Sequence, residues 1–292
     1  MDPVVFYFSG TGNTRYVARS IATGLDGPPI VRSIESVTPA EADVLIEGAS
    51  MVGIGYPVYA SDLPQPMKDF LLALGSHPGT PAFVFCTQWM YSGDGARAAT
   101  RYLRRSGLRV RFAEHFRMPD DISVSAIRFP YTNDPVRIRR VLARADRRAA
   151  VFARRIRGAP ARSVFHLLRP RRRGFNPLSR FLGWFQRVPF RATFDRWRDD
   201  VSIDLGRCTR CGLCTRLCPS GNLHYDAASD TFPTNGRCVL CMRCYDFCPV
   251  AAVEYMKKPH DLRRGAPYRG PEPTTLADLL ADAAPARRRD VP

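Results

Sequence analysis

The sequence predicts an α/β protein in which a doubly wound parallel sheet is followed by a small α+β domain built on cysteines. Two observations lead to this prediction. Short β-rich runs alternate with helical patterns through residues 1–117, which is typical of a parallel sheet with crossover helices. Eight of the nine cysteines then fall in two short runs, at residues 208–219 and 238–249.

The front domain has five expected strands, at residues 4–8, 29–34, 51–55, 82–86 and 109–116. Helical patterns lie between and after them, at residues 14–24, 63–74, 95–106 and 134–157. The last helix should close the sheet with its arginines facing outward. Ligands of such a sheet bind in the loops that follow the carboxyl ends of the strands.

The basic character of the chain is concentrated in one segment. The formal net charge is +17, yet residues 134–198 alone hold 19 Lys and Arg against 3 Asp and Glu, a net +16. We therefore expect four zones along the chain: a front domain at 1–157, a basic aromatic-rich connector at 158–199, a cysteine domain at 200–258 and a flexible Pro/Arg-rich tail at 259–292.

Within the connector, residues 176–187 should form a short amphipathic helix. Asn176 is a plausible N-cap, Pro177 fits the first helical position, and apolar residues follow at helical spacing. We expect this helix to bury its aromatic stripe between the two domains. The chain has neither an export signal nor an apolar run of roughly 20 residues, which predicts a cytoplasmic location.

The loop after the first strand is a candidate phosphate site. It offers small residues, hydroxyls, backbone N–H groups and the start of a helix whose dipole favours an anion. Its spacing differs from that of nucleoside-triphosphate and dinucleotide loops, and a simple tight strand-to-helix turn is the alternative reading. The candidate residues are Ser9, Gly10, Thr11, Gly12, Asn13 and Thr14.

Two further loops bring aromatic residues and glycines to the places where a planar ring would lie. One follows the third strand and the other follows the fourth strand, although aromatic residues there can also simply cap the sheet edge. The first loop supplies Tyr56, Pro57, Val58 and Tyr59. The second supplies Thr87, Gln88, Trp89, Gly93, Asp94 and Gly95.

Residues 1–117 resemble a flavodoxin. The S/T-x-T-G-x-T signature of that family is matched by Ser9, Thr11, Gly12 and Thr14. The resemblance implies a flavodoxin-like sheet in which this loop holds the monophosphate of FMN and the two later loops flank the isoalloxazine ring.

The cysteines form two copies of the pattern C-x₂-C-x₂-C-x₃-C-P, which indicates metal binding rather than disulfides in a chain without an export signal. Three thiolates of one run wrap one cluster, and the fourth reaches the other cluster. We therefore expect one [4Fe–4S] cluster on Cys208, Cys211, Cys214 and Cys248, and a second on Cys238, Cys241, Cys244 and Cys218. Zinc is the competing reading, and Cys86 is expected to be a buried apolar residue. Residues 200–258 resemble the two-cluster bacterial ferredoxin.

The whole chain thus resembles the flavodoxin–ferredoxin fusion proteins. That resemblance implies electron transfer between low-potential clusters and FMN, to or from a redox partner protein. The alternative is an FMN-dependent reductase of a small organic, corrinoid, haem-related or quinone-like substrate. No catalytic acid–base or nucleophile constellation is visible. The basic connector suits an acidic partner or a peripheral membrane contact, and nucleic-acid binding is not expected because no recognised nucleic-acid fold accompanies it.

Overall fold

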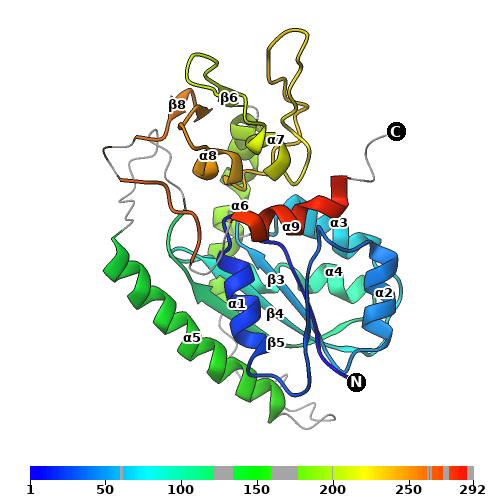
Figure 1. The fold of residues 1–292 in the computed structure, drawn as a ribbon. Helices are drawn as coiled ribbons and strands as arrows, with labels where there is room; N and C mark the ends of the chain where they lie inside the picture. The colour runs from blue at the N-terminus through cyan, green and yellow to red at the C-terminus, as the bar shows by residue number, and fades with distance from the viewer. Residues whose placement is uncertain are drawn as a thin grey trace.

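The computed structural model describes residues 1–59, 62–121, 134–158, 177–198, 200–261, 263, 265–271 and 276–287. Its front domain is a five-stranded parallel sheet in the order β2-β1-β3-β4-β5 (Figure 1). The strands are β1 (Val4–Tyr7), β2 (Ile30–Ser33), β3 (Val52–Pro57), β4 (Pro81–Gln88) and β5 (Arg109–Arg117). All five expected strands are confirmed, and this strand order is the flavodoxin-like one.

Helices cover both faces of the sheet (Figure 1). Helices α1 (Asn13–Ala22) and α5 (Pro135–Arg157) pack on one face, where Phe152 lies against Phe83 and Phe116. Helices α2 (Pro39–Glu47), α3 (Gln65–Ala73) and α4 (Thr100–Arg105) pack on the other face, and a 3₁₀ turn η1 (Gly95–Arg97) precedes α4. The expectation that a helix at 134–157 closes the sheet is therefore confirmed.

Among the described residues of the front domain, helix α2 is the one helix without a counterpart in the helical patterns of the sequence. Its start carries a recognisable signal, because Thr38 and Glu41 form a capping box and Pro39 occupies the first turn. The capping box satisfies backbone N–H groups that a helix start otherwise leaves open.

The cysteine domain is a small α+β unit. Strands β6 (Val201–Ile203), β7 (Val253–Tyr255) and β8 (Lys258–Pro259) form an antiparallel sheet in the order β6-β7-β8. The short helices α7 (Leu213–Leu217) and α8 (Arg243–Phe247) each follow the first two cysteines of one run and contain the third. This arrangement agrees with the fold predicted for residues 200–258.

Helix α6 (Pro177–Arg198) corrects the expectation for the connector helix. It is longer than predicted, and its aromatic stripe is not buried between the domains. Leu178, Phe181 and Phe185 are 65%, 58% and 61% exposed. The helix instead meets the front domain through Gly183, which contacts Asp94, and through Arg187, whose Nη1 donates to Asp94 Oδ1 at 2.7 Å. No helix in the described ranges is long and apolar enough to cross a bilayer.

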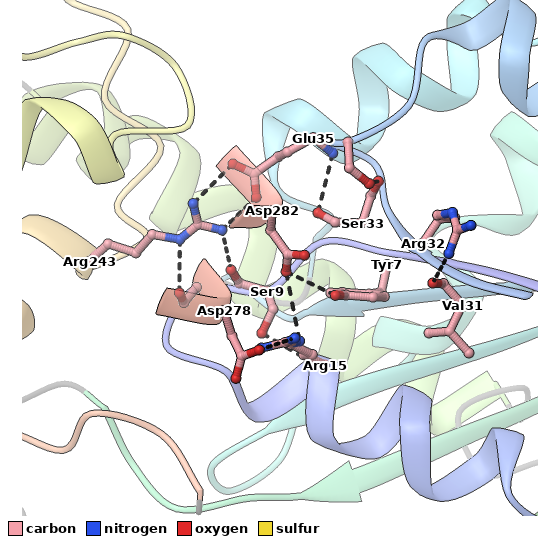
Figure 2. Close-up of polar contacts among 12 residues, drawn as sticks. Tyr7, Ser9, Arg15, Val31, Arg32, Ser33, Glu35, Arg243, Asp278 and Asp282 are labelled. Atoms are coloured by element: carbon pink, nitrogen blue, oxygen red, sulfur yellow. Dashed lines mark hydrogen bonds and ion pairs between the residues drawn. The ribbon is translucent and has the colours of Figure 1, made fainter. Parts of the chain in front are cut away.

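Residues 276–287 also differ from the expectation of a flexible tail. Helix α9 (Leu276–Arg287) packs its buried Leu279 against Leu213, Leu217 and Phe247 of the cysteine domain. Its acidic side reaches the front domain, where Tyr7 donates to Asp282 at 2.9 Å and Arg15 donates to Asp278 at 2.7 Å (Figure 2). Helix α9 therefore bridges the two domains.

Candidate functional site

The loop between β1 and α1 is shaped as a cup of hydrogen-bond donors. Gly12 has a φ of 105°, a left-handed conformation that suits glycine, and α1 begins at Asn13 with no acidic residue in its first turn. All six residues from Ser9 to Thr14 are buried. Within the described part of the chain, no protein acceptor bonds the backbone N–H groups of residues 10–14. The loop thus keeps five buried donors available for an anion.

The hydroxyls of the cup are held in place by its surroundings. Ser9 Oγ accepts a hydrogen bond from the backbone N–H of Arg15 at 3.3 Å, which satisfies one N–H group in the first turn of α1. The hydroxyls of Thr14 and Thr87 share a hydrogen bond of 2.8 Å, so the end of β4 is tied to the cup. Asn13 Nδ2 donates to the Pro119 carbonyl at 3.1 Å and Asn13 Oδ1 accepts from Tyr268 at 2.8 Å.

Asp121, after β5, is a site residue that the sequence analysis missed. Its Oδ2 accepts a hydrogen bond from Thr11 Oγ1 at 2.8 Å, which places a carboxylate at the rim of the cup. Burial raises the pKa of Asp121, and the Thr11 hydroxyl opposes that shift. Nothing in its local sequence marks it, because only the fold brings the segment after β5 to the loop after β1.

In the loop after β3, the two tyrosines have different environments. Tyr56 is buried in the core, where its hydroxyl donates to the Gly95 carbonyl at 2.7 Å and accepts from Ala99 N–H at 3.3 Å. These two hydrogen bonds hold the segment 95–99, which follows β4, against the core. Tyr59 lies at the surface of the core, and its hydroxyl would be 3.0 Å from a Cβ atom added to Gly10. The structure therefore brings only Tyr59 of this pair to the cup.

The loop after β4 packs closely on the loop after β3. Val58 N–H donates to the Thr87 carbonyl at 2.9 Å, and a Cβ atom on Gly95 would lie 2.9 Å from the Val58 side chain. Gln88 and Trp89 at the start of this loop are half-buried, whereas Gly93 and Asp94 are buried. Asp94 is engaged by Arg187 of α6, so its carboxylate fixes the connector helix to this loop. Pro57 ends β3 beside Thr87.

The cysteines line two separate cavities, and each cavity draws its fourth cysteine from the other run. One cavity is lined by Cys208, Cys211, Cys214 and Cys248. The other is lined by Cys218, Cys238, Cys241 and Cys244. These are the two sets expected from the crossed pattern. Pro249 lies in the wall of the first cavity and Pro219 in that of the second.

The two runs present their sulfur atoms in matching ways. Arg210 N–H and Leu240 N–H donate to Cys208 and Cys238 Sγ, at 3.3 and 3.4 Å. Asn222 N–H and Ala252 N–H donate to Cys218 and Cys248 Sγ, at 3.1 and 3.2 Å. Hydrogen bonds of this kind tune the potential of an iron–sulfur cluster.

The backbone of both runs turns through left-handed positions at matching places. Arg210 and Leu240 have φ of 57° and 54°, and Gly212 and Met242 have φ of 68° and 62°. Such angles are costly for residues other than glycine. Both runs therefore share one backbone conformation, which directs their thiols into the two cavities.

In the described ranges, no three His, Cys, Asp or Glu side chains come close enough together to hold a single metal ion. A zinc ion needs ligand sulfurs at about 2.3 Å from one centre. Burial, and then the other cysteines of its own set, raise the pKa of Cys214 to about 11. Metal binding at this set must therefore displace protons.

The second cysteine set meets the cup of hydrogen-bond donors directly. The Cys241 carbonyl oxygen would lie 2.8 Å from a Cβ atom on Gly10, and Tyr59 reaches the same point. Val239 and Cys241 share one apolar cluster with Phe8, Tyr56 and Leu63 of the front domain. Burial, followed by the nearby Cys241, raises the pKa of Tyr59 well above its usual value. The cup and the second cysteine cavity are thus adjacent parts of one site.

The fold and the site together define a class of protein: a flavodoxin-like domain joined to a ferredoxin-like domain with two cysteine sets. Residues 207–253 match the family model of the 4Fe-4S dicluster domain, which supports two [4Fe–4S] clusters. The combination is consistent with a flavodoxin–ferredoxin fusion. Curated proteins gave no match to this chain.

Solved structures with a similar fold include two flavodoxins. One is a flavodoxin from the domain Archaea, with 18% identity and a TM-score of 0.36, covering 54% of this chain and 99% of that chain. Flavodoxin 2 from Bacillus cereus has 16% identity and a TM-score of 0.37, covering 53% and 99%. Rubredoxin oxygen:oxidoreductase from the anaerobe Desulfovibrio gigas has 15% identity and a TM-score of 0.39, covering 57% of this chain and 37% of that chain.

Proposed function

We propose that this protein carries electrons between two [4Fe–4S] clusters and one FMN, and exchanges them with a redox partner protein. The contact of Gly10 with Cys241 carries this proposal, because it joins the phosphate cup to the second cysteine set without an intervening layer of protein. A cluster held by that set would therefore lie beside a flavin held by the cup.

The cup fits the phosphate of FMN. Five buried N–H groups at residues 10–14 have no protein acceptor in the described ranges, and they lie at the start of α1, where the helix dipole favours an anion. The Thr11 hydroxyl donates to Asp121, whereas the Thr14 hydroxyl adds a donor when Thr87 donates the hydrogen bond that the two share. FMN, when bound, supplies a centre that exchanges one or two electrons, whereas a cluster exchanges single electrons.

The exposure of the two cysteine sets suggests the order in which electrons pass through the clusters. Cys211 of the first set is exposed, whereas Cys241 of the second set is buried against the front domain. We propose that the first cluster exchanges electrons with the partner, and that the second cluster passes them to or from the flavin.

Anaerobic reconstitution tests this proposal. We expect about eight iron and eight sulfide ions with one FMN per chain. A reductive titration, followed by EPR and by flavin absorbance, should reveal two clusters and a flavin that equilibrate within one molecule. Two zinc ions in place of iron would refute the cluster assignment. Turnover of a small acceptor without any partner would instead indicate the FMN-dependent reductase.

A further inference from the structure

Arg243 is a fully buried cation at the junction of the two domains (Figure 2). It lies between Cys241 and Cys244 in the chain, and its side chain is 1% exposed. Nη1 and Nη2 donate to the two carboxylate oxygens of Glu35, at 2.9 and 2.5 Å. This bidentate ion pair holds the guanidinium plane in a fixed orientation.

The remaining donors of Arg243 bond backbone carbonyls. Nη2 donates to the Ser9 carbonyl at 2.6 Å, and Nε donates to the Gly10 carbonyl at 2.9 Å. Nη1 also donates to the Leu217 carbonyl at 3.3 Å. A guanidinium has five N–H groups, so Arg243 uses its full hydrogen-bonding capacity at this junction.

Two of these contacts determine how the phosphate cup presents its donors. In a trans peptide, the C=O and the following N–H point in opposite directions. Because Arg243 draws the carbonyls of Ser9 and Gly10 toward the cysteine domain, the N–H groups of Gly10 and Thr11 point away from it. These are two of the five N–H groups that have no protein acceptor in the described ranges.

The role of Arg243 is geometric rather than purely electrostatic. Glu35 neutralises its charge within the same buried contact, so little net charge is left to attract a phosphate over a distance. Lysine would keep the charge, but it lacks the rigid planar fork that can bind a carboxylate and two carbonyls at once.

We infer that Arg243 is a positioning residue for the flavin phosphate: the cysteine domain supplies the side chain that orients the cup of the front domain. This inference rests on the proposed function. It makes the affinity for FMN depend on a residue that lies between two cysteines of the second set, so that the two cofactor sites are built together.

Binding of FMN and of riboflavin to the full chain with reconstituted clusters tests the inference. Riboflavin carries the same ring but no phosphate, so the ratio of the two dissociation constants reports on the cup alone. In Arg243→Lys we expect FMN binding to weaken about tenfold and riboflavin binding to stay the same. The matched control is Arg216→Gln, because Arg216 is an exposed arginine of the same domain. It should leave both constants unchanged.

A second variant protects the test against loss of folding. A buried carboxylate left without its partner is strongly destabilising. Arg243→Gln combined with Glu35→Gln removes both charges together, so that no buried charge is left without its partner. If Arg243→Lys loses its cluster EPR signals, this double variant takes its place, with the same expected loss of FMN preference.

The outcomes separate the inference from the proposed function. A variant with intact clusters that retains the full preference for FMN over riboflavin would overturn the role of Arg243. Equal weakening of both flavins would also overturn it, because that result indicates a general structural role. Wild-type protein that holds both clusters but binds neither flavin would instead refute the proposed function.

Discussion

Gly10 and Cys241 are in contact across the junction of the two domains. A Cβ atom on Gly10 would lie 2.8 Å from the Cys241 carbonyl oxygen, closer than side chains tolerate. The obstructing atom belongs to the backbone, so it cannot rotate away as the end of a flexible side chain would. The absence of a side chain at position 10 is therefore a condition for the close approach of the cup to the second cysteine set.

Substitution of Gly10 by alanine should push the two domains apart. We expect Gly10→Ala to retain iron and sulfide but to slow flavin reduction by the clusters, with a loss of folding stability of about 1–3 kcal/mol. Stopped-flow reduction of the flavin and urea unfolding measure the two effects. Gly48→Ala is the control, since its added Cβ has no neighbour closer than 4.0 Å. Equal flavin reduction rates in Gly10→Ala and wild type would contradict the contact.

The crossed cysteine sets predict reciprocal effects of two substitutions. Cys248→Ser should alter the EPR signal of the cluster on Cys208, Cys211 and Cys214, because Cys248 shares their cavity. Cys218→Ser should alter the other cluster. If each substitution damaged the cluster of its own run instead, the crossed assignment would be wrong.

The raised pKa of Asp121 leads us to expect that flavin binding depends on pH. Burial raises its pKa in the folded protein, so the neutral acid persists to a higher pH than in the unfolded chain. Its contribution to stability is therefore present at low pH and lost as pH rises through the folded pKa. The carboxylate formed at that pH would repel a phosphate in the cup, and FMN binding should weaken.

The variant Asp121→Asn isolates this effect. It should bind FMN more tightly than wild type at high pH, and the difference between the two should disappear as the pH falls. Calorimetric titration with FMN across the pH range provides the measurement. Asp69→Asn, at an exposed position of α3, serves as the control for loss of one negative charge. Parallel pH profiles for wild type and Asp121→Asn would rule out this role for Asp121.

Helix α5 should be an integral part of the front domain although it begins in the basic segment. Phe152 is 2% exposed and packs edge-on against Phe83 and Phe116. Phe152→Ala should reduce the free energy of unfolding by about 3–5 kcal/mol. Val151→Ala, at a neighbouring exposed position, should change it by less than about 0.5 kcal/mol. Denaturant unfolding of the two variants makes the comparison, and similar losses would show that α5 is not packed as described.

Local patterns in the sequence were sufficient to predict the sheet and the positions of the glycine-rich loop and the two cysteine runs. Each strand is a short β-rich run, and the cup follows the first of them directly. The cysteine spacing itself limits which thiols can share a cluster, because a C-x₂-C-x₂-C turn is a compact local structure. These features depend on neighbours within a few residues, so they can be read along the chain.

Features that depend on distant pairs emerged only from the tertiary structure. Arg243 and Glu35 are separated by 208 positions, and Asp121 meets Thr11 across 110 positions. The sequence also could not predict that the apolar stripe of α6 is exposed or that α9 packs on the cysteine domain. An apolar pattern shows that one face of a helix can be buried, but it does not show against which part of the protein. A buried guanidinium is stable only where the fold brings acceptors from several segments together, and no segment of the sequence contains that information alone.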